Sequence, residues 1–235
     1  MPLECSAQSH PELADLPVVV FEEVLPHPPR VLIDDCFAKV DGSLGRPELR
    51  WILQLAKHHR TTGVLEIGTY FGSTTYNLAV NLPATTIHTI DLPPDFSADD
   101  PAQQTKDDLH LIRGRRVGEA FRDQPESSRI VQHWGDSATY DFSRIAQPLN
   151  FFFIDGSHNE HYAMNDSRVC LRLARGDSLL LWHDCDAGHP GVLRALAHLI
   201  AAGLPIARID RSSTAMLRIN SDDPRLRQVL GAIEA

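Results

Sequence analysis

The chain has 235 residues, of which 43% are hydrophobic and 23% charged, and its formal net charge is −9. This composition is ordinary for a globular protein and excludes a fibrous or disordered class. No apolar run approaches the roughly 18 residues that a membrane-spanning helix needs. A negative net charge disfavours nucleic acid as a partner, because phosphate binding needs a basic face. We therefore expect a globular protein with neither a membrane nor a nucleic acid as its partner.

Two further features indicate a cytoplasmic protein. The first 17 residues lack the basic and apolar segments of a secretory signal peptide. The cysteines form no Cys-x-x-Cys pair and have no disulfide-framework spacing, so a reducing compartment is the default. They are Cys5, Cys36, Cys170 and Cys185.

The N-terminal part of the chain differs from the rest. Residues 1–45 are rich in proline and show little periodicity, so we interpret them as an arm or lid that precedes a domain spanning residues 46–235. Apolar residues recur at helical spacing between 47 and 60. A second helix is expected to begin with Ser73 or Thr74 as its N-cap.

Apolar runs of strand length alternate with helical patterns over the rest of the chain. Near-continuous apolar strands are typical of a parallel sheet that is covered on both faces. The last two runs are separated by only three residues, which is hairpin spacing. The pattern predicts an α/β protein with a seven-stranded, mostly parallel sheet, an antiparallel last strand and helices on both faces. The expected strands are 63–68, 86–91, 129–134, 149–154, 178–182, 205–210 and 214–219.

A glycine turn follows the first of these strands and indicates a ligand crevice. Gly68 permits a sharp turn and Gly72 a close approach of the backbone to a ligand or a helix. A strand, glycine turn and helix in this order form nucleotide crevices in open α/β sheets. Tyr70 stands where a dinucleotide fingerprint has its second glycine, which lets a pyrophosphate touch the backbone. The turn therefore favours a nucleoside ligand without a pyrophosphate, and S-adenosylmethionine is the candidate.

Polar residues follow the other parallel strands at the points where the strands end. Because parallel strands end at one edge of the sheet, these side chains are expected to surround one ligand site. Asp91 is suited to accept two hydrogen bonds from a ribose diol. A strand-terminal Asp can equally be a helix cap, but such residues after every strand are a stronger signal. The groups are Asp91, Asp136 with Ser137, Asp155 with His158, and His183 with Asp184.

The combined motifs resemble a bacterial family of class I S-adenosylmethionine methyltransferases with a Rossmann-like fold. The first motif, GVLEIGTYFGSTT, is similar to that of catechol and caffeoyl-CoA O-methyltransferases. The later motifs, IHTIDLPP, FFFIDGSH and WHDCDAGHPGV, resemble a family related to the macrolide-sugar O-methyltransferases. The resemblance implies methylation of a hydroxyl on a small, sugar-like or phenolic acceptor. It also implies a homo-oligomer, in the first instance a dimer.

The resemblance also implies roles for individual residues. Glu66, Gly68, Gly72 and Ser73 would hold the amino-acid and ribose parts of the cofactor, with Tyr70 beside them. Asp91 would bind the ribose, and Asp136 and Ser137 would flank the adenine.

The same resemblance implies a catalytic end of the site. In metal-dependent relatives, acids at the positions of Asp155 and Asp184 hold a divalent ion, with a third ligand at the position of His183. Relatives carry an acid at that third position, and a histidine there suits a transition metal better than Mg²⁺, or no metal at all. His158 matches the relatives' catalytic base, and an imidazole of ordinary pKa is suited to that task at neutral pH. Asp155 also contributes to the cofactor site.

Three other functions remain open from the sequence. Asp91 would also suit the ribose of NAD in an oxidoreductase, although the G-x-G-x-x-G fingerprint is absent. A cofactor-binding protein without turnover would have the same fold. A metal-dependent hydrolase could use Asp155, His158, His183 and Asp184, but it leaves the glycine turn unexplained.

Two stretches are assigned less specific roles. The segment 92–127 is long, polar and rich in Asp and Pro, and loops of that length are usually functional or partly helical. Within it, the cluster of Arg113, Arg115 and Arg116 is interpreted as a solvated loop in preference to an anion site. His161, Tyr162 and His189 lie in loops near the expected site, where they are either acceptor contacts or plain surface residues.

Overall fold

The computed structural model describes residues 16–35, 40, 42–96 and 106–234. The strands are β1 (Val18–Val19), β2 (Gly63–Ile67), β3 (Thr86–Asp91), β4 (Ile130–Trp134), β5 (Leu149–Ile154), β6 (Ala174–Trp182), β7 (Ala207–Ile209) and β8 (Ala215–Asn220). The helices are α1 (Phe21–Val24), α2 (Arg46–His58), α3 (Ser73–Asn81), α4 (Lys106–Gly114), α5 (Glu160–Leu173), α6 (Pro190–Ala201) and α7 (Pro224–Glu234), with short 3-10 helices η3 (Pro125–Arg129) and η4 (Phe142–Arg144).

All strands of the described residues belong to one sheet, in the order β1-β7-β8-β6-β5-β2-β3-β4. The pairs β2–β3, β2–β5, β3–β4 and β5–β6 are parallel, whereas β8 runs antiparallel to both β6 and β7. The seven predicted strands and the antiparallel last strand are confirmed. The eighth strand, β1, comes from the N-terminal arm and pairs with β7. Its two residues are too few to give a periodic signal in the sequence.

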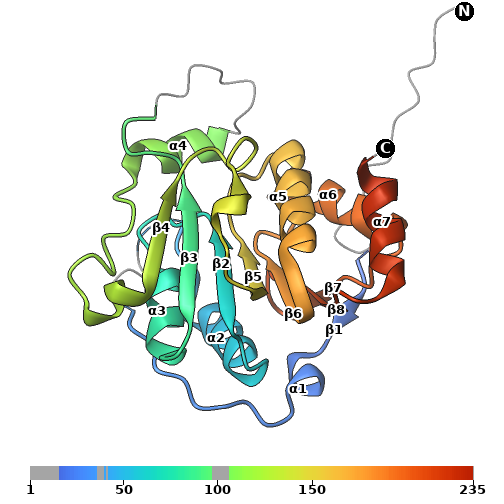
Figure 1. The fold of residues 1–235 in the computed structure, drawn as a ribbon, viewed down its shortest axis with the longest axis horizontal. Coiled ribbons are helices and arrows are strands. Elements are labelled where there is room, and N and C mark those ends of the chain that lie inside the picture. Colours follow the sequence, from blue (N-terminus) through green and yellow to red (C-terminus); the bar gives the residue numbers. More distant parts are fainter. Residues whose placement is uncertain (1–15, 36–39, 41, 97–105, 235) are drawn as a thin grey trace, which may run out of the picture.

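Side chains of alternate residues in the central strands enter two separate cores, because successive side chains of a strand point to opposite faces. In β5, Phe152 packs with α5, α6 and α7, whereas Phe151 and Phe153 pack with α2 and α3. Figure 1 shows these two groups of helices on either side of the sheet. The prediction of helices on both faces is therefore confirmed.

The strand order reverses at the neighbouring pair β2 and β5, since β3 and β4 lie to one side and β6 to the other. Ligands of open α/β sheets bind at such a switch point, outside the carboxyl ends of the strands. Helix α4 lies across these ends (Figure 1). The fold thus provides a crevice between the turn after β2 and the turn after β5.

The described part of the N-terminal arm contributes to the body of the protein. Phe21 is 3% exposed, and its ring stacks on that of Trp51 at 5.1 Å between centroids. The backbone N–H groups of Leu32 and Asp34 donate to Asn side chains of α3. The predicted lid over the site would also involve residues 1–15, 36–39 and 41, which lie outside the described residues. The division into an arm and a domain stays a prediction.

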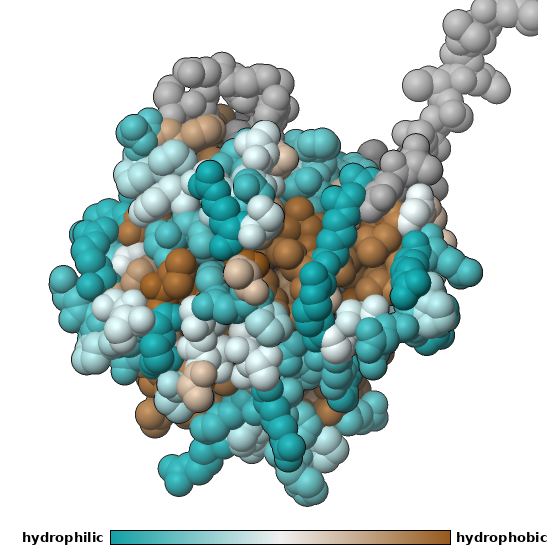
Figure 2. All heavy atoms as spheres, viewed as in Figure 1, coloured by the Kyte–Doolittle hydropathy of each residue, from teal (hydrophilic) through white to brown (hydrophobic). Residues whose placement is uncertain are grey.

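Hydrophilic side chains cover most of the face shown in Figure 2, and apolar groups appear mainly near its centre and beside α7. No helix in the described ranges is long and apolar enough to cross a membrane.

Candidate functional site

A pocket of about 520 Å³ lies at the carboxyl ends of the parallel strands. Its walls come from the turns after β2, β3, β4, β5 and β6 and from α4. The predicted site residues that line it are Gly68, Tyr70, Asp91, Asp136, Ser137, Asp155, His158, His183 and Asp184. The chain therefore brings these strand-terminal groups together, as the sequence pattern indicated.

At one end of the pocket, Asp91 is held by several partners, among them the backbone of Tyr70 and the side chain of Arg115. The backbone N–H of Tyr70 donates to Asp91 Oδ2 at 2.7 Å, and Arg115 Nε lies 3.4 Å from Asp91 Oδ1. The Arg115 side chain is only 5% exposed and also donates to the backbone carbonyls of Leu92 and Pro93. Arg115 is thus a buried partner of Asp91, and the interpretation of this arginine as part of a solvated loop was wrong.

Tyr70 and Gly68 adopt backbone conformations with positive φ, at 50° and 99°. A Cβ on Gly68 would lie 1.9 Å from the carbonyl oxygen of Asp155, so only glycine allows the turns after β2 and β5 to approach so closely. The positive φ of Tyr70 accompanies the hydrogen bond from its N–H to Asp91. The turn is therefore shaped by contacts between strand ends.

Three residues that were predicted to hold the cofactor do not line the pocket. Glu66 is 1% exposed and accepts hydrogen bonds from the hydroxyls of Thr75 and Thr89. A Cβ on Gly72 would meet the Phe121 ring at 2.5 Å, so this glycine makes room for a side chain of the protein itself. Ser73 is the first residue of α3. The N-cap of that helix is Gly72, without a side-chain hydrogen bond, so the predicted Ser73 or Thr74 cap was wrong.

Asp136 and Ser137 lie in the turn after β4. Asp136 Oδ1 accepts from the Ala138 N–H at 2.9 Å, and Oδ2 accepts from the Tyr162 hydroxyl at 3.1 Å. Tyr162 lines the pocket as well. Asp136 therefore ties the turn after β4 to helix α5 and borders the same wall as Asp91.

At the other end of the pocket, Asp155, His183 and Asp184 converge. His183 Nδ1 lies 3.1 Å from Asp155 Oδ1 and 3.1 Å from Asp184 Oδ1. The three ligand atoms lie within 4.8 Å of one another. Adjacent ligands of an octahedral divalent ion at bond lengths of about 2.1 Å are roughly 3 Å apart, so the two distances from His183 Nδ1 are compatible with such an ion. The three residues predicted as metal ligands therefore lie together, and metal binding itself stays a prediction.

The other ring nitrogen of His183, Nε2, contacts neighbouring side chains of the protein. Nε2 lies 3.1 Å from the Ser213 hydroxyl and 3.6 Å from Glu48 Oε2. Metal-binding histidines commonly donate their other N–H to such a partner, which fixes the ring. Burial alone would lower the pKa of His183, but Asp155, Asp184 and Glu48 outweigh it and raise this pKa well above 6.5. Without a metal, the same arrangement holds an imidazolium between carboxylates.

His158 is enclosed by two carboxylates. Its Nδ1 lies 2.8 Å from Asp108 Oδ1, and its Nε2 lies 2.8 Å from Asp184 Oδ2. Burial would lower the pKa of His158, but the hydrogen bonds to Asp108 and Asp184 outweigh it and raise the pKa to about 10. With a pKa raised in this way, the ring is a cation between two acids at neutral pH. The role of His158 as the base stays a prediction.

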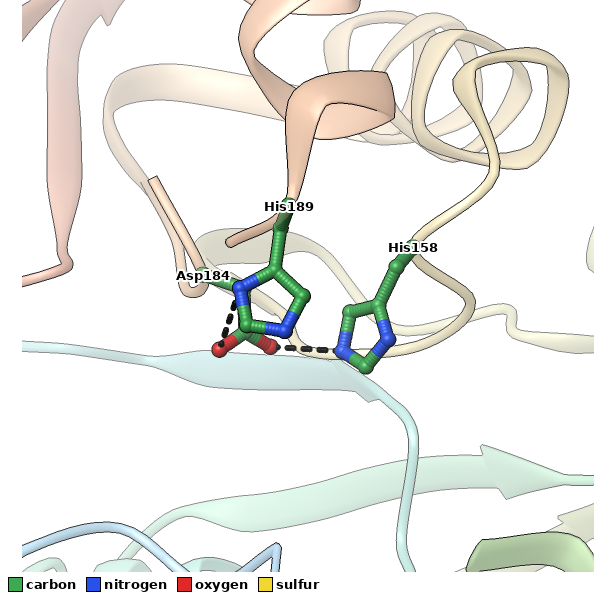
Figure 3. A group of neighbouring side chains, drawn as sticks. All are labelled: His158, Asp184 and His189. Atoms are coloured by element: carbon green, nitrogen blue, oxygen red, sulfur yellow. Dashed lines mark hydrogen bonds and ion pairs between the residues drawn. The ribbon is translucent and has the colours of Figure 1, made fainter. Parts of the chain in front are cut away.

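His189 also borders this end of the pocket. Its Nδ1 lies 3.0 Å from Asp186 Oδ1 and 3.6 Å from Asp184 Oδ1, and its ring centroid is 4.3 Å from that of His158 (Figure 3). His161, in contrast, is exposed and lines a shallow groove beside α6 and α7.

The sequence interpretation missed Glu48, Asp108 and Arg115. Glu48 lies on α2 and accepts from the N–H of Ser213, which is 165 positions away in the chain. Asp108 is 50 positions from His158. No local pattern marks such residues, because their partners are set by the packing of distant elements. For Arg115, the sequence offered one signal, which is a basic residue directly after the polar helix α4.

The family model for a methyltransferase domain matches residues 65–185. The chain belongs to this methyltransferase family. The match contains the glycine turn, Asp91 and every strand-terminal group up to Asp184. The match to a methyltransferase domain does not fit the alternatives of an NAD-dependent oxidoreductase or a metal-dependent hydrolase.

Solved structures of methyltransferases have the same fold. The SAH-bound methyltransferase PaMTH1 of Podospora anserina is 15% identical, with a TM-score of 0.56 over 80% of this chain and 83% of its own. An O-methyltransferase of Bacillus cereus in complex with SAH is 14% identical, with a TM-score of 0.53 over 85% and 90%. TomG of Streptomyces achromogenes, an O-methyltransferase of tomaymycin synthesis in complex with SAM, is 17% identical, with a TM-score of 0.53 over 86% and 94%. No protein of curated function matches the chain in sequence.

Proposed function

We propose that the protein transfers the methyl group of S-adenosylmethionine to a hydroxyl oxygen of a small molecule. The observation that carries the proposal is a single pocket that joins the Asp91 end to the cluster of Asp155, His183 and Asp184. One end offers a carboxylate suited to a ribose, and the other offers polar groups suited to a hydroxyl. Membership of a methyltransferase family and the SAM- or SAH-bound neighbours support the choice of cofactor. The O-methyltransferases among these neighbours support oxygen as the acceptor atom.

The cofactor would lie across the ends of β2, β3 and β4. Asp91 accepts hydrogen bonds from the ribose hydroxyls, while Arg115 and the Tyr70 N–H hold its carboxylate in place. Ile90 and Leu92 give this end apolar walls that suit an adenine ring, and Asp136 and Ser137 lie at its edge. Because the sulfonium carries its own leaving group, the protein has mainly to align methyl and oxygen.

The acceptor would lie at the ends of β5 and β6. Asp155 and Asp184 accept the hydrogen bond of its hydroxyl, so that an oxygen lone pair points toward the methyl group. Asp155 takes the proton as the carbon–oxygen bond forms, and the sulfur keeps the electron pair of the bond that breaks. The charge of His158 favours the ionised form of Asp184. Burial would raise the pKa of Asp184, but His158 and His183 hold this pKa well below its usual value.

Asp155, His183 and Asp184 would hold a divalent ion at this end. Such an ion lowers the pKa of a bound hydroxyl. A nitrogen donor among two carboxylates favours a transition metal over Mg²⁺.

The test is methyl transfer from labelled S-adenosylmethionine to a panel of polyhydroxylated and phenolic acceptors. We expect label in an ether product with the wild-type protein and a loss of at least tenfold in kcat with Asp184→Asn. The control is Asp123→Asn, which removes the same charge from an exposed residue outside the pocket. Label in nitrogen-bound products alone would contradict O-methylation.

A further inference from the structure

Helix α4 forms one wall of the pocket, although no site residue was expected on it. Asp108, His110, Leu111 and Ile112 line the pocket from this helix. The Asp108 side chain is only 5% exposed. A carboxylate buried to this extent is costly unless charged or hydrogen-bonding partners surround it. Its partners therefore show what the helix is attached to.

Asp108 holds both the backbone and the ring of the turn after β5. Its Oδ2 accepts from the Ser157 hydroxyl at 2.8 Å, and its Oδ1 accepts from the His158 N–H at 3.2 Å. The same Oδ1 lies 2.8 Å from His158 Nδ1. One carboxylate thus fixes the position of His158 in the chain and the orientation of its ring.

The contact continues across the ring to the turn after β6. His158 Nε2 lies 2.8 Å from Asp184 Oδ2, and the His158 side chain is 11% exposed (Figure 3). An imidazole held at both nitrogens cannot rotate about its own side-chain bonds without breaking a contact. With Asp108 removed, only Asp184 would hold the ring. Asp184 itself has a positive φ of 56°, so its turn is already in an uncommon conformation.

We propose that Asp108 is a positioning residue for methyl transfer: it fixes the ring of His158 and, through that ring, the carboxylate of Asp184 at the acceptor end of the pocket. This rests on the proposed function for the reaction itself. The side chain of Asp108 contacts Ser157 and His158 after β5, whereas Asp91 follows β3, and β2 lies between these two strands. Loss of Asp108 should therefore lower kcat and leave the affinity for the cofactor unchanged.

The experiment compares Asp108→Ala and Asp108→Asn with the exposed-acid control Asp123→Asn. Asparagine keeps an oxygen for His158 Nδ1–H and an amide group for Ser157, whereas alanine keeps neither. We expect kcat to fall at least tenfold in Asp108→Ala and less in Asp108→Asn. Affinity for S-adenosylhomocysteine, measured by calorimetry, should stay within twofold of wild type in both. A kcat within twofold of wild type in Asp108→Ala, or a loss of cofactor affinity equal to the loss of kcat, would overturn the proposal.

A second readout does not depend on turnover. The His158 Nδ1 proton, which faces Asp108 Oδ1 at a nitrogen–oxygen distance of 2.8 Å, should give a downfield proton resonance, assigned by its absence in His158→Gln. We expect this resonance in wild type and in Asp108→Asn, and its loss in Asp108→Ala. Its persistence in Asp108→Ala would overturn the contact. A wild-type protein that transfers no methyl group but shows this pattern would contradict the proposed function while keeping the link between Asp108 and His158.

Discussion

Glu66 carries an almost completely buried carboxyl group, and its ionisation should make stability depend on pH. Burial raises the pKa of Glu66 to about 8, against the hydrogen bonds from Thr75 and Thr89, and the carboxylates of Asp155 and Asp91 add to the increase. The folded state therefore keeps a proton that the unfolded chain loses near pH 4.5. Stability from this group is complete below that pH and is lost as the pH rises through about 8.

Replacement of Glu66 with Gln should remove this pH dependence. Between pH 5 and pH 8, the wild-type free energy of unfolding should fall by on the order of 1 kcal/mol per pH unit more than that of Glu66→Gln. Denaturant unfolding at several pH values measures the difference. Glu23→Gln, at an exposed position of α1, should follow the wild-type slope. Equal slopes for wild type and Glu66→Gln would show that Glu66 is ionised in the fold.

The cluster of Asp155, His183 and Asp184 should bind a divalent ion in the free protein. We expect Mn²⁺, Co²⁺ or Zn²⁺ to raise the melting temperature more than Mg²⁺, because His183 supplies a nitrogen ligand. Chelation should reverse the increase, and Asp184→Asn should abolish it, while Asp123→Asn should keep it. If no divalent ion changes the melting temperature of the wild-type protein, the two acids act by hydrogen bonding alone.

Residues at the ends of predicted strands could be placed from the sequence, whereas their partners could not. Asp91, Asp155 and Asp184 follow apolar runs directly, so the edge of the sheet brings them together. Asp108 and Glu48 reach the site from helices, and only tertiary packing decides which helix faces the pocket. The pairing of His158 with Asp108 was not predictable for the same reason, and the role of His158 as the base stays a prediction.

At the scale of elements, the close approach of the turns after β2 and β5 depends on one glycine. Replacement of Gly68 with Ala would place a Cβ 1.9 Å from a backbone oxygen, at a φ of 99°. We expect the free energy of unfolding to fall by at least about 2 kcal/mol. Gly231→Ala is the matched control, because a Cβ there meets nothing within 4 Å in helix α7, where alanine is favoured. Equal stability of both variants would contradict the described turn.

The elements themselves were predictable to different degrees. The central strands could be located because they are apolar runs buried on both faces, with Phe151, Phe152 and Phe153 of β5 at 0% exposure. Helix α4 could not, because it lies in a polar segment and its role arises from contacts with the turns after β3 and β5. Strand β1 is defined by pairing with β7 and not by a pattern of its own.

At the scale of the whole molecule, the described part of the arm is expected to stabilise the fold. Phe21 is buried against Trp51, so Phe21→Ala should lower the free energy of unfolding by about 3 kcal/mol or more. Leu32→Ala, at a side chain that is 70% exposed, should have almost no effect. Denaturant unfolding of both variants makes the comparison. An unchanged stability of Phe21→Ala would favour the view of this segment as a detachable lid.

The central claim for the molecule is that the pocket binds S-adenosylmethionine with its ribose on Asp91. Titration calorimetry with S-adenosylhomocysteine on wild type, Asp91→Ala and the exposed control Asp95→Ala tests it most directly. Loss of charge-assisted hydrogen bonds should weaken binding to Asp91→Ala roughly tenfold or more, and Asp95→Ala should bind like wild type. Equal affinity in wild type and Asp91→Ala, or a wild-type protein that binds NAD in place of S-adenosylhomocysteine, would contradict the account.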